Sequence, residues 1–179
     1  MPSGDERALL ERARQGDSAA LGEIYDRYAA KIYSYILYQV GDQALAEDLT
    51  ASVFMKMLDA IKASKAWRLS FSSWLYRIAH NIVVDHFRRN SHGKNLPLNE
   101  GLIPSKDNPS ATVETLMATE TVKEAMGQLT VEQRTVVILK FFKECSNLEV
   151  AKIMDKTEGA VKSLQYRALA ALRRQLGGD

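Results

Sequence analysis

Apolar side chains recur along this chain at the spacing of an α-helix, and no stretch shows the alternation typical of a β-strand. Residues Asp5 to Arg14 predict a short first helix. Gly16 and Asp17 break this helix. Asp17 or Ser18 can then cap the next one. We expect four helices in a compact domain, the last three built on longer apolar stripes. These stripes are Leu21, Ile24, Tyr25, Tyr28, Ile32, Tyr35, Ile36 and Val40, then Leu45, Leu49, Val53, Met57 and Ile61, then Trp74, Leu75, Ile78, Ile82 and Phe87.

The composition changes after about residue 90. The segment from Asn90 to Ala118 holds three of the four prolines, Pro97, Pro104 and Pro109, among glycine, asparagine and serine. Such a stretch has little apolar surface to bury, so we expect a flexible, extended linker.

Helical patterning resumes at about Thr119. Thr130 and Gln133 form a capping box that opens a helix. Four of its residues are expected to pack on the helices that follow: Val136, Val137, Leu139 and Phe142. The predicted fold class is all-α, with two small helical domains joined by a flexible linker. The predicted boundaries are 5–90 for the first domain, 91–118 for the linker and 119–176 for the second domain.

The second domain ends in a helix-turn-helix pattern. Ser146 and Glu149 form another capping box, so a helix begins there. Its inward residues are expected to be Leu148, Ala151 and either Ile153 or Met154. Asp155, Lys156 and Thr157 then form a break, because an aspartate tolerates the left-handed backbone of such a turn. The next helix is predicted from about Glu158 to Leu176.

This last helix has two different faces. Val161, Ala168 and Leu172 recur on the apolar face. The other face carries the candidate readers of bases in a DNA major groove, Lys162, Ser163, Tyr166 and Arg167. Five cations against Glu158 give the turn and helix a local charge of +4: Lys156, Lys162, Arg167, Arg173 and Arg174. A helix-turn-helix with this local charge favours DNA over protein as its ligand.

The first domain has a polar face of its own. Arg77, Asn81 and Arg88 fall on one side of the fourth helix, where an amide between guanidinium groups suits base contact beside phosphate contact. Just before this helix, Lys65, Trp67 and Arg68 combine cations with an aromatic ring, as proteins that hold unstacked bases do. These residues also have structural interpretations. Trp67 and Trp74 can be core anchors, and Arg88 and Arg89 can complement the helix dipole.

Composition narrows the class of protein. The net charge is only +2 over 179 residues, so any indication of nucleic-acid binding must come from local clusters of lysine and arginine. One cysteine, Cys145, excludes an internal disulfide and fits a reducing cytoplasm. No segment is apolar over the length that a membrane crossing needs, so we expect no membrane insertion. Cys145 is either a buried thiol or a sensor of oxidation.

Four motifs in order give this chain a resemblance to a known family. They are the residues from Ala46 to Thr50 with Val53 and Phe54; those from Trp74 to Ala79 with Asn81 and Asp85; those from Leu129 to Gln133; and those from Ser146 to Leu176. Together they resemble regions 2 and 4 of an extracytoplasmic function (ECF) RNA polymerase sigma factor. The resemblance covers nearly the whole chain and implies bacterial core RNA polymerase and promoter DNA as partners. It implies an anti-sigma factor as a further partner, because members of the family commonly have one.

The resemblance also implies residue roles. The acidic third helix, with a charge of about −3 between Asp42 and Ala60, would dock on the polymerase through Glu47, Asp48, Leu49, Val53 and Phe54. From the residues alone, such acids are usually only a solvated face. The minus-ten element would be read by Lys65, Trp67, Arg68, Arg77, Asn81 and Arg88. The minus-thirty-five element would be read by Lys162, Ser163, Tyr166 and Arg167. The polymerase supplies the chemistry, so we expect no catalytic residue, metal or cofactor in this chain.

Two rival classes stand beside this hypothesis. A helix-turn-helix transcriptional regulator without polymerase affinity would share the C-terminal half, but it would leave the Asn81 face and the acidic helix unexplained. A metal enzyme would have to use His80, Asp85, His86 or His92. His80 and Asp85 are not joined by a recognised ligand motif, and three scattered histidines are more often structural or solvated.

Overall fold

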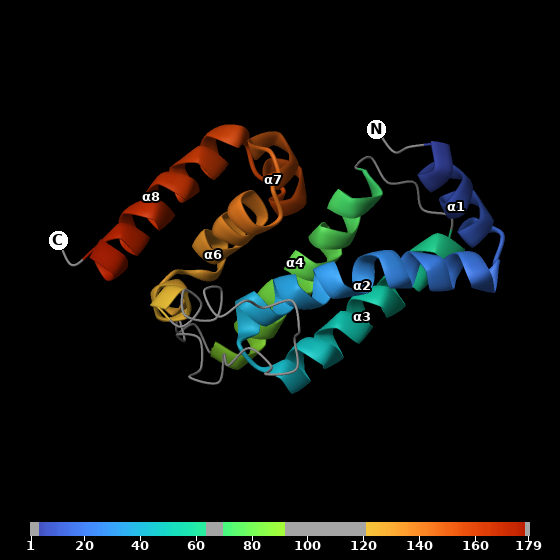
Figure 1. Cartoon of the computed structure of the whole chain (residues 1–179), viewed down its shortest axis with the longest axis horizontal. Coiled ribbons are helices and arrows are strands. Elements are labelled where there is room, and N and C mark those ends of the chain that lie inside the picture. Colours follow the sequence, from blue (N-terminus) through green and yellow to red (C-terminus); the bar gives the residue numbers. More distant parts are fainter. Residues whose placement is uncertain (1–3, 64–69, 92–120, 178–179) are drawn as a thin grey trace.

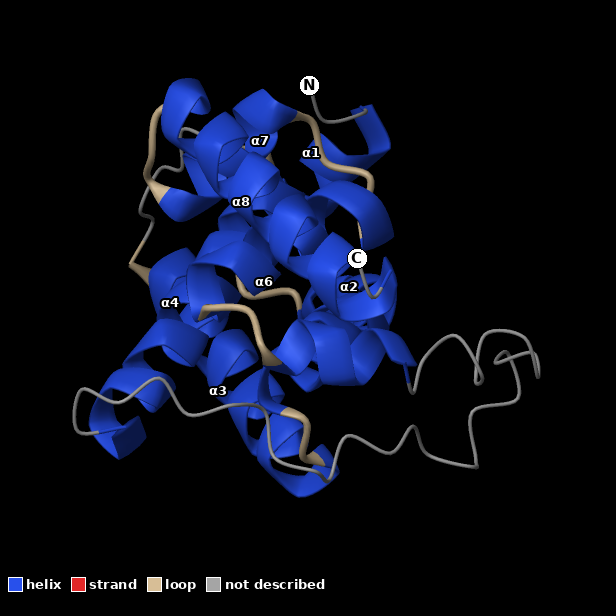
Figure 2. Ribbon diagram, turned by 90° about the vertical axis from the view of Figure 1, so that its left-hand side faces the viewer, coloured by secondary structure: helices blue, strands red, loops and turns tan. Residues whose placement is uncertain are grey.

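The computed structural model describes residues 4–63, 70–91 and 121–177, and within these ranges the chain is helical and contains no strand (Figure 2). The predicted all-α class is therefore confirmed. The helices are α1 (Gly4–Arg14), α2 (Ser18–Val40), α3 (Gln43–Lys62), α4 (Phe71–Ser91), a helical segment at 121–127, α6 (Val131–Val137), the π-helix η1 (Ile138–Phe142), α7 (Asn147–Met154) and α8 (Glu158–Gly177). Within the described ranges, none of these helices has both the length and the apolar character that a bilayer crossing needs.

Local caps decide where the N-terminal helices begin and end. The Asp17 carboxylate accepts from the backbone N–H groups of Ala19 and Ala20 and so starts α2. Gly41 ends α2 with a φ of 77°, a left-handed conformation that costs glycine little. Asp42 then caps α3 by accepting from the backbone N–H of Leu45. The break at Gly41 and Asp42 turns the chain so that α3 packs back against α2.

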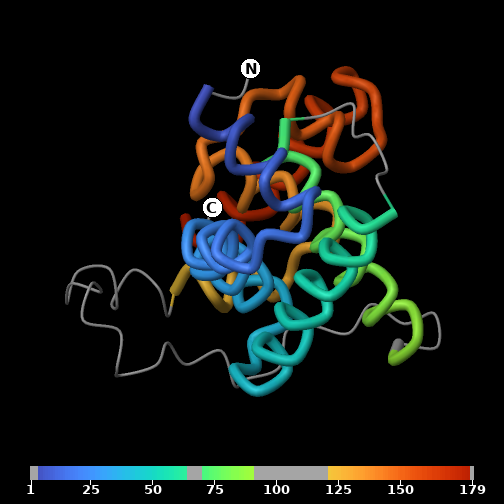
Figure 3. Tube along the Cα trace, turned by 90° about the vertical axis from the view of Figure 1, so that its right-hand side faces the viewer, coloured from blue at the N-terminus to red at the C-terminus, as the bar shows by residue number. Residues whose placement is uncertain are grey.

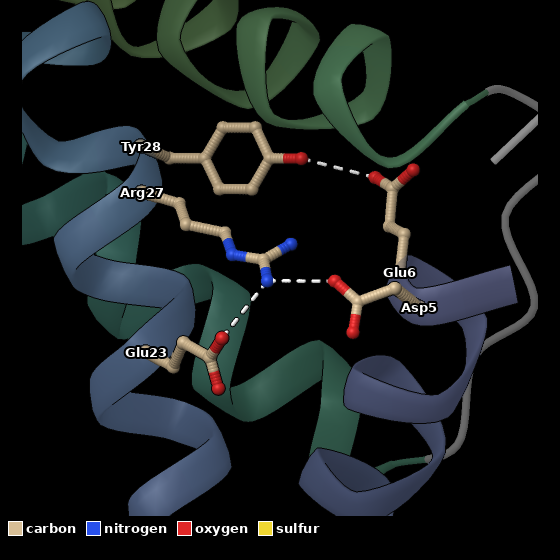
Figure 4. A network of polar contacts seen from close by, with 5 residues as sticks. All are labelled: Asp5, Glu6, Glu23, Arg27 and Tyr28. Carbon is tan, nitrogen blue, oxygen red and sulfur yellow. Dashed lines mark hydrogen bonds and ion pairs between the residues drawn. The ribbon is translucent and has the colours of Figure 1, made fainter. Parts of the chain in front are cut away.

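A polar cluster fastens α1 to α2 (Figure 4). The guanidinium of Arg27 donates to Asp5 and to Glu23, both at 2.8 Å. These groups are exposed and add little stability. The Tyr28 hydroxyl donates to Glu6 at 3.0 Å, and burial raises the pKa of Tyr28 to about 12, so this phenol stays protonated at neutral pH. The cluster therefore joins the first turn of α1 to α2 at the surface, while Leu9, Leu10 and Ala13 of α1 are buried in the core.

The helix-turn-helix is confirmed in its local details. Both capping boxes form, one from Thr130 with Gln133 and one from Ser146 with Glu149. Asp155 ends α7 with φ 56° and ψ 50°, the left-handed conformation expected of it. Helix α8 then begins at Glu158, after the three-residue break.

Two inward-facing predictions were wrong. Leu148 is 50% exposed, because α7 turns Val150, Ala151, Ile153 and Met154 into the core. At 100° per residue Leu148 lies on the opposite side from the centre of that group.

Phe142 is 43% exposed rather than buried against the helix-turn-helix as expected. Its ring stacks on Tyr38 of α2, with centroids 5.0 Å apart. The cause is η1, in which the N–H of Lys143 bonds to the carbonyl of Ile138 five residues earlier. A π-turn holds more residues than an α-turn, so it rotates Phe142 away from the face that a 3.6-residue period predicts. The other three residues of that prediction, Val136, Val137 and Leu139, are buried.

The N-terminal and C-terminal helices also pack against each other. Helix α7 lies on α4, and α6 and η1 contact α2. In Figure 1 the orange α7 lies beside the green α4, and the red α8 lies on the far side of α6 and α7; Figure 3 shows the molecule from another side, with the blue helices in front. One core of buried residues runs through both halves, from Leu9 to Ala168.

Candidate nucleic-acid interface

The outward face of α8 carries the residues assigned to base reading. Lys162, Ser163, Tyr166 and Arg167 are all exposed, and Tyr166 is 77% accessible. They share one side because residues three and four apart are neighbours on a helix surface. The Arg167 Nε atom donates to the Ser163 carbonyl oxygen at 3.3 Å, so the guanidinium lies along this face. All four side chains are accessible to a ligand.

The opposite face of α8 anchors the helix. Val161, Leu164 and Ala168 are buried, and Leu172 is partly buried. The apolar stripe expected from the sequence is confirmed for Val161 and Ala168, which are fully inaccessible. Because this stripe packs on α6 and α7, the basic face cannot turn inward. The structure thus holds the polar face of α8 toward solvent.

The turn before α8 makes two polar contacts. The Thr157 hydroxyl accepts from the backbone N–H of Ala160 at 3.1 Å and caps the helix. Lys156 forms an ion pair with Glu132 of α6, with 3.3 Å between Nζ and Oε1. One of the five cations counted in the sequence therefore neutralises an acid of α6 and adds little to the exposed basic field.

The outward face of α4 carries Arg77, Asn81 and Arg88. Asn81 and Arg88 are exposed and Arg77 is half-buried, while Ala79, which lies between them in sequence, is buried. Spacings of four and seven residues place the three polar side chains on one helix face. The Nη1 atom of Arg88 is 3.6 Å from the Oδ1 atom of Asp85, in a loose ion pair. The Nη2 atom of Arg77 is 3.8 Å from the Oδ2 atom of Asp155, which belongs to the turn of the helix-turn-helix.

Lys65, Trp67 and Arg68 lie outside the described residues, as does the linker predicted at 91–118 beyond Ser91. Trp74 is described, and it behaves as a core anchor. It is partly buried, and its ring centroid is 5.5 Å from that of Phe71.

The acidic face of α3 is only partly accessible. Glu47 and Asp48 are exposed and Leu49 is half-buried, so these three can meet a partner directly. Val53 is fully buried, and Phe54 is 6% exposed. The last two therefore support the helix from inside in this arrangement.

Two apolar side chains beside this face were not foreseen as contacts. Met55 is 60% exposed and Tyr25 of α2 is 51% exposed. The Tyr25 ring lies edge-on to Phe54, with centroids 5.0 Å apart. A signal for Met55 was present in the sequence, since it follows Asp48 by seven residues and so shares its helix face. Exposed methionine and tyrosine side chains beside the acids suit a protein partner, because methionine and aromatic residues are enriched at protein interfaces.

Two of the three histidines and the cysteine lie among the described residues, and each has its own surroundings. His80 is buried between the Tyr35 hydroxyl and the Thr135 hydroxyl, with Nδ1 3.4 Å from each oxygen. His86 bonds to Asn90 on the same helix, and His92 lies outside the described residues. Within the described ranges, no three His, Cys, Asp or Glu side chains are grouped as a metal site requires. Burial raises the pKa of the Cys145 thiol to about 11, which disfavours the thiolate form that reacts with oxidants.

Two family models match the chain. Sigma-70 region 2 matches residues 24–93, which hold the acidic face of α3 and the polar face of α4. Sigma-70, region 4 matches residues 119–172, which hold α6, α7 and the exposed face of α8. Both polar faces of the molecule therefore fall inside matched ranges.

Two curated proteins are similar over most of the chain. Identity is 36% over 173 residues with the ECF RNA polymerase sigma factor BldN of Streptomyces coelicolor, which covers 96% of this chain and 66% of BldN, just under two thirds of that protein's length. Identity is 30% over 164 residues with the ECF RNA polymerase sigma factor SigX of Bacillus subtilis, covering 86% of this chain and 81% of SigX. In fold, the chain is similar to the sigma factor RpoE of Bartonella quintana, solved in complex with the anti-sigma factor NepR. That match has a TM-score of 0.69 at 20% identity and covers 88% of this chain and 97% of the other.

Proposed function

Because the chain belongs to the ECF family of RNA polymerase sigma factors, we propose that it directs bacterial core RNA polymerase to promoters by reading duplex DNA with α8 and melted DNA with α4. The observation that carries the proposal is the presence of two separate exposed polar faces, one within each matched region. A regulator that only binds duplex DNA would need the face on α8 alone.

The α8 face suits the minus-thirty-five element. A helix that presents lysine and arginine around a tyrosine can place hydrogen-bond donors on guanine edges and phosphates in a major groove. Tyr166 is a large aromatic side chain of this face and is 77% exposed. It would add van der Waals contact to the bases that Lys162 and Arg167 flank.

The α4 face suits the nontemplate strand of the minus-ten element. An exposed amide such as Asn81 can make paired hydrogen bonds to one unstacked base, while Arg77 and Arg88 contact phosphates. Lys65, Trp67 and Arg68 would hold a flipped base next to this face. Preferential binding of the unstacked strand would lower the free energy of the melted state and so promote opening.

The surface on α3 suits the polymerase itself. Glu47, Asp48 and Leu49 would meet basic and apolar groups of the core enzyme, with Met55 and Tyr25 extending the contact and Val53 and Phe54 supporting the helix from within. The charge and the exposed apolar groups of this surface support the assignment. An anti-sigma factor is a further proposed partner, in line with the complex known for a protein of the same fold.

The proposal includes no catalytic activity of this chain, because the polymerase makes the RNA. Both polar faces contain groups that bind and orient nucleic acid, and the function needs no metal or cofactor. We place the chain in the cytoplasm, where bacterial polymerase and promoters meet.

Binding to a minus-thirty-five duplex tests the α8 face. Alanine at Lys162 or Arg167 should cost about 1 to 3 kcal/mol where the side chain reads a base, and should mainly flatten the salt dependence where it meets phosphate. Tyr166→Ala should weaken recognition more than Ser163→Ala. The control is Arg14→Ala, which removes one positive charge at an exposed position of α1. Unchanged affinity in the triple alanine variant of Lys162, Tyr166 and Arg167 would contradict the assignment.

A further inference from the structure

A row of side-chain contacts inside the N-terminal half runs from the first turn of α1 to the first turn of α4. Glu6 of α1 accepts a hydrogen bond from the Tyr28 hydroxyl of α2 at 3.0 Å (Figure 4). The Tyr28 ring lies edge-on to the ring of Phe71, the first residue of α4, with centroids 5.3 Å apart. Phe71 is 1% exposed, and its ring centroid is 5.5 Å from that of Trp74. We call Glu6, Tyr28 and Phe71 the Tyr28 row, since they connect three helices.

Further contacts fix the Tyr28 ring and the start of α4. The Lys31 ammonium lies over the Tyr28 ring, 5.8 Å from its centroid. The pKa of Tyr28, raised to about 12 by burial, keeps the hydroxyl a donor to Glu6 at neutral pH. At the other end, the Ser70 hydroxyl oxygen accepts from the Ser73 backbone N–H at 3.2 Å and so caps α4. The Tyr28 row therefore acts on a helix end of defined geometry.

Helix α1 lies at the end of the bundle where α3 stops and α4 begins (Figure 1). It contacts both α2 and α3, and Ile61 in the last turn of α3 is 2% exposed. Residues 64–69 connect α3 to α4 in the sequence and hold the proposed flipped-base contacts Lys65, Trp67 and Arg68. The Tyr28 row thus ends at the helix terminus that directly follows these contacts.

The position of Phe71 also affects the polar face of α4. Arg77 and Asn81 follow Phe71 by six and ten residues, or about 9 and 15 Å along the helix at about 1.5 Å per residue. A helix transmits a tilt of its first turn along its length, because its backbone is hydrogen-bonded throughout. A misplacement of about 1 Å is enough to impair a functional site. The Tyr28 row therefore influences the contacts that α4 offers to a melted strand.

We propose that Glu6 and Tyr28 are positioning residues for capture of the melted minus-ten strand, because their hydrogen bond holds Phe71 and the start of α4 in place. The inference rests on the proposed function, the reading of melted DNA by α4. It gives α1 a part in promoter opening, although α1 holds none of the residues assigned to DNA. The neighbouring Asp5 also joins α1 to α2, but it does so through the exposed Arg27, outside the Tyr28 row.

Substitutions in the first turn of α1 and at Tyr28 test the proposal. Glu6→Ala removes the acceptor, and Tyr28→Phe removes the donor while the ring stays against Phe71. Glu6→Gln keeps an oxygen that accepts from the hydroxyl. The matched control is Asp5→Ala, which removes the same charge one residue earlier and breaks an exposed ion pair between the same two helices. Glu6, Tyr28 and Asp5 are not among the residues assigned to DNA or polymerase.

The main readout is capture of single-stranded DNA by the holoenzyme of core RNA polymerase and the full-length chain. A fluorescently labelled nontemplate strand that spans the minus-ten element of a transcribed promoter is titrated, and anisotropy gives the dissociation constant. Glu6→Ala and Tyr28→Phe should each raise this constant about fivefold, part of the roughly tenfold or larger effect of losing one hydrogen bond to a charged group. The double variant should be no weaker than either single variant. Glu6→Gln and Asp5→Ala should stay within about twofold of wild type.

Further measurements separate positioning from general damage. Affinity for a minus-thirty-five duplex and for core polymerase should be unchanged in all variants, and open-complex formation by Glu6→Ala should slow by the same factor as strand capture weakens. Unchanged strand capture by Glu6→Ala and Tyr28→Phe would overturn the inference, and so would an equal loss in Asp5→Ala or a parallel loss of duplex affinity. In each of these cases the wild-type holoenzyme still captures the strand. If wild type itself does not, the proposed reading of melted DNA fails, and the inference fails with it.

Discussion

His80 makes the stability of this fold depend on pH in a direction that can be worked out. His80 is 6% exposed, and its imidazole lies against the hydroxyls of Tyr35 on α2 and Thr135 on α6. Burial lowers its pKa from 6.5 to about 4. Among nearby charges, Glu132 raises the pKa, and Lys156 and Arg77 lower it.

The sign follows from which state binds the proton. As pH falls below 6.5, the unfolded chain protonates this histidine, while the folded chain keeps it neutral until about pH 4. The contribution of His80 to stability is therefore complete above pH 6.5 and is lost as pH falls from 6.5 toward 4. At pH 5 the linkage relation gives a loss of about 2 kcal/mol in the free energy of unfolding relative to pH 8.

Urea unfolding of wild type and His80→Gln at pH 8 and pH 5 measures this loss. Glutamine can still hydrogen-bond to the two hydroxyls but does not titrate. Other titrating groups are common to both proteins and cancel, including His86, whose pKa partial burial also lowers. We expect wild type to lose about 2 kcal/mol more than His80→Gln between the two pH values. An identical loss in both proteins would refute the reasoning.

The remaining predictions concern the assigned contacts of the N-terminal half. Reversing Glu47 and Asp48 to lysine should weaken binding to core polymerase with the helical fold intact, because exposed charges add little stability. A double variant that binds core as tightly as wild type would show that α3 does not dock there. Asn81→Ala should slow open-complex formation and relax the minus-ten preference while duplex binding by α8 stays unchanged. Unaltered transcription from variant minus-ten sequences would count against Asn81 as a reader.

Features set by a few neighbouring residues were predictable from the sequence. The capping boxes at Thr130 and Ser146 and the left-handed turn at Asp155 form as expected, because each depends on side chains within three residues of the backbone that they bond. The two faces of α8 follow from a regular helical period and were predictable for the same reason.

Features set by long-range packing were not predictable in the same way. Gln39 and Arg134 meet across 95 residues, and no local pattern marks either as a partner of the other. Phe142 was misplaced because one π-turn changes the residue count per turn, which a fixed 3.6-residue period does not contain. The contacts between the N-terminal and C-terminal helices, such as α7 on α4, also join residues far apart in sequence. A helix-by-helix interpretation of the chain therefore did not predict them.

Run-off transcription with purified core RNA polymerase on a library of genomic promoters tests the sigma-factor function most directly. The account predicts transcripts that appear only when this chain is added and that start downstream of a shared pair of minus-ten and minus-thirty-five sequences. If the chain bound DNA alone yet neither bound core polymerase nor gave any chain-dependent transcript, it would be a helix-turn-helix regulator and the account would be contradicted.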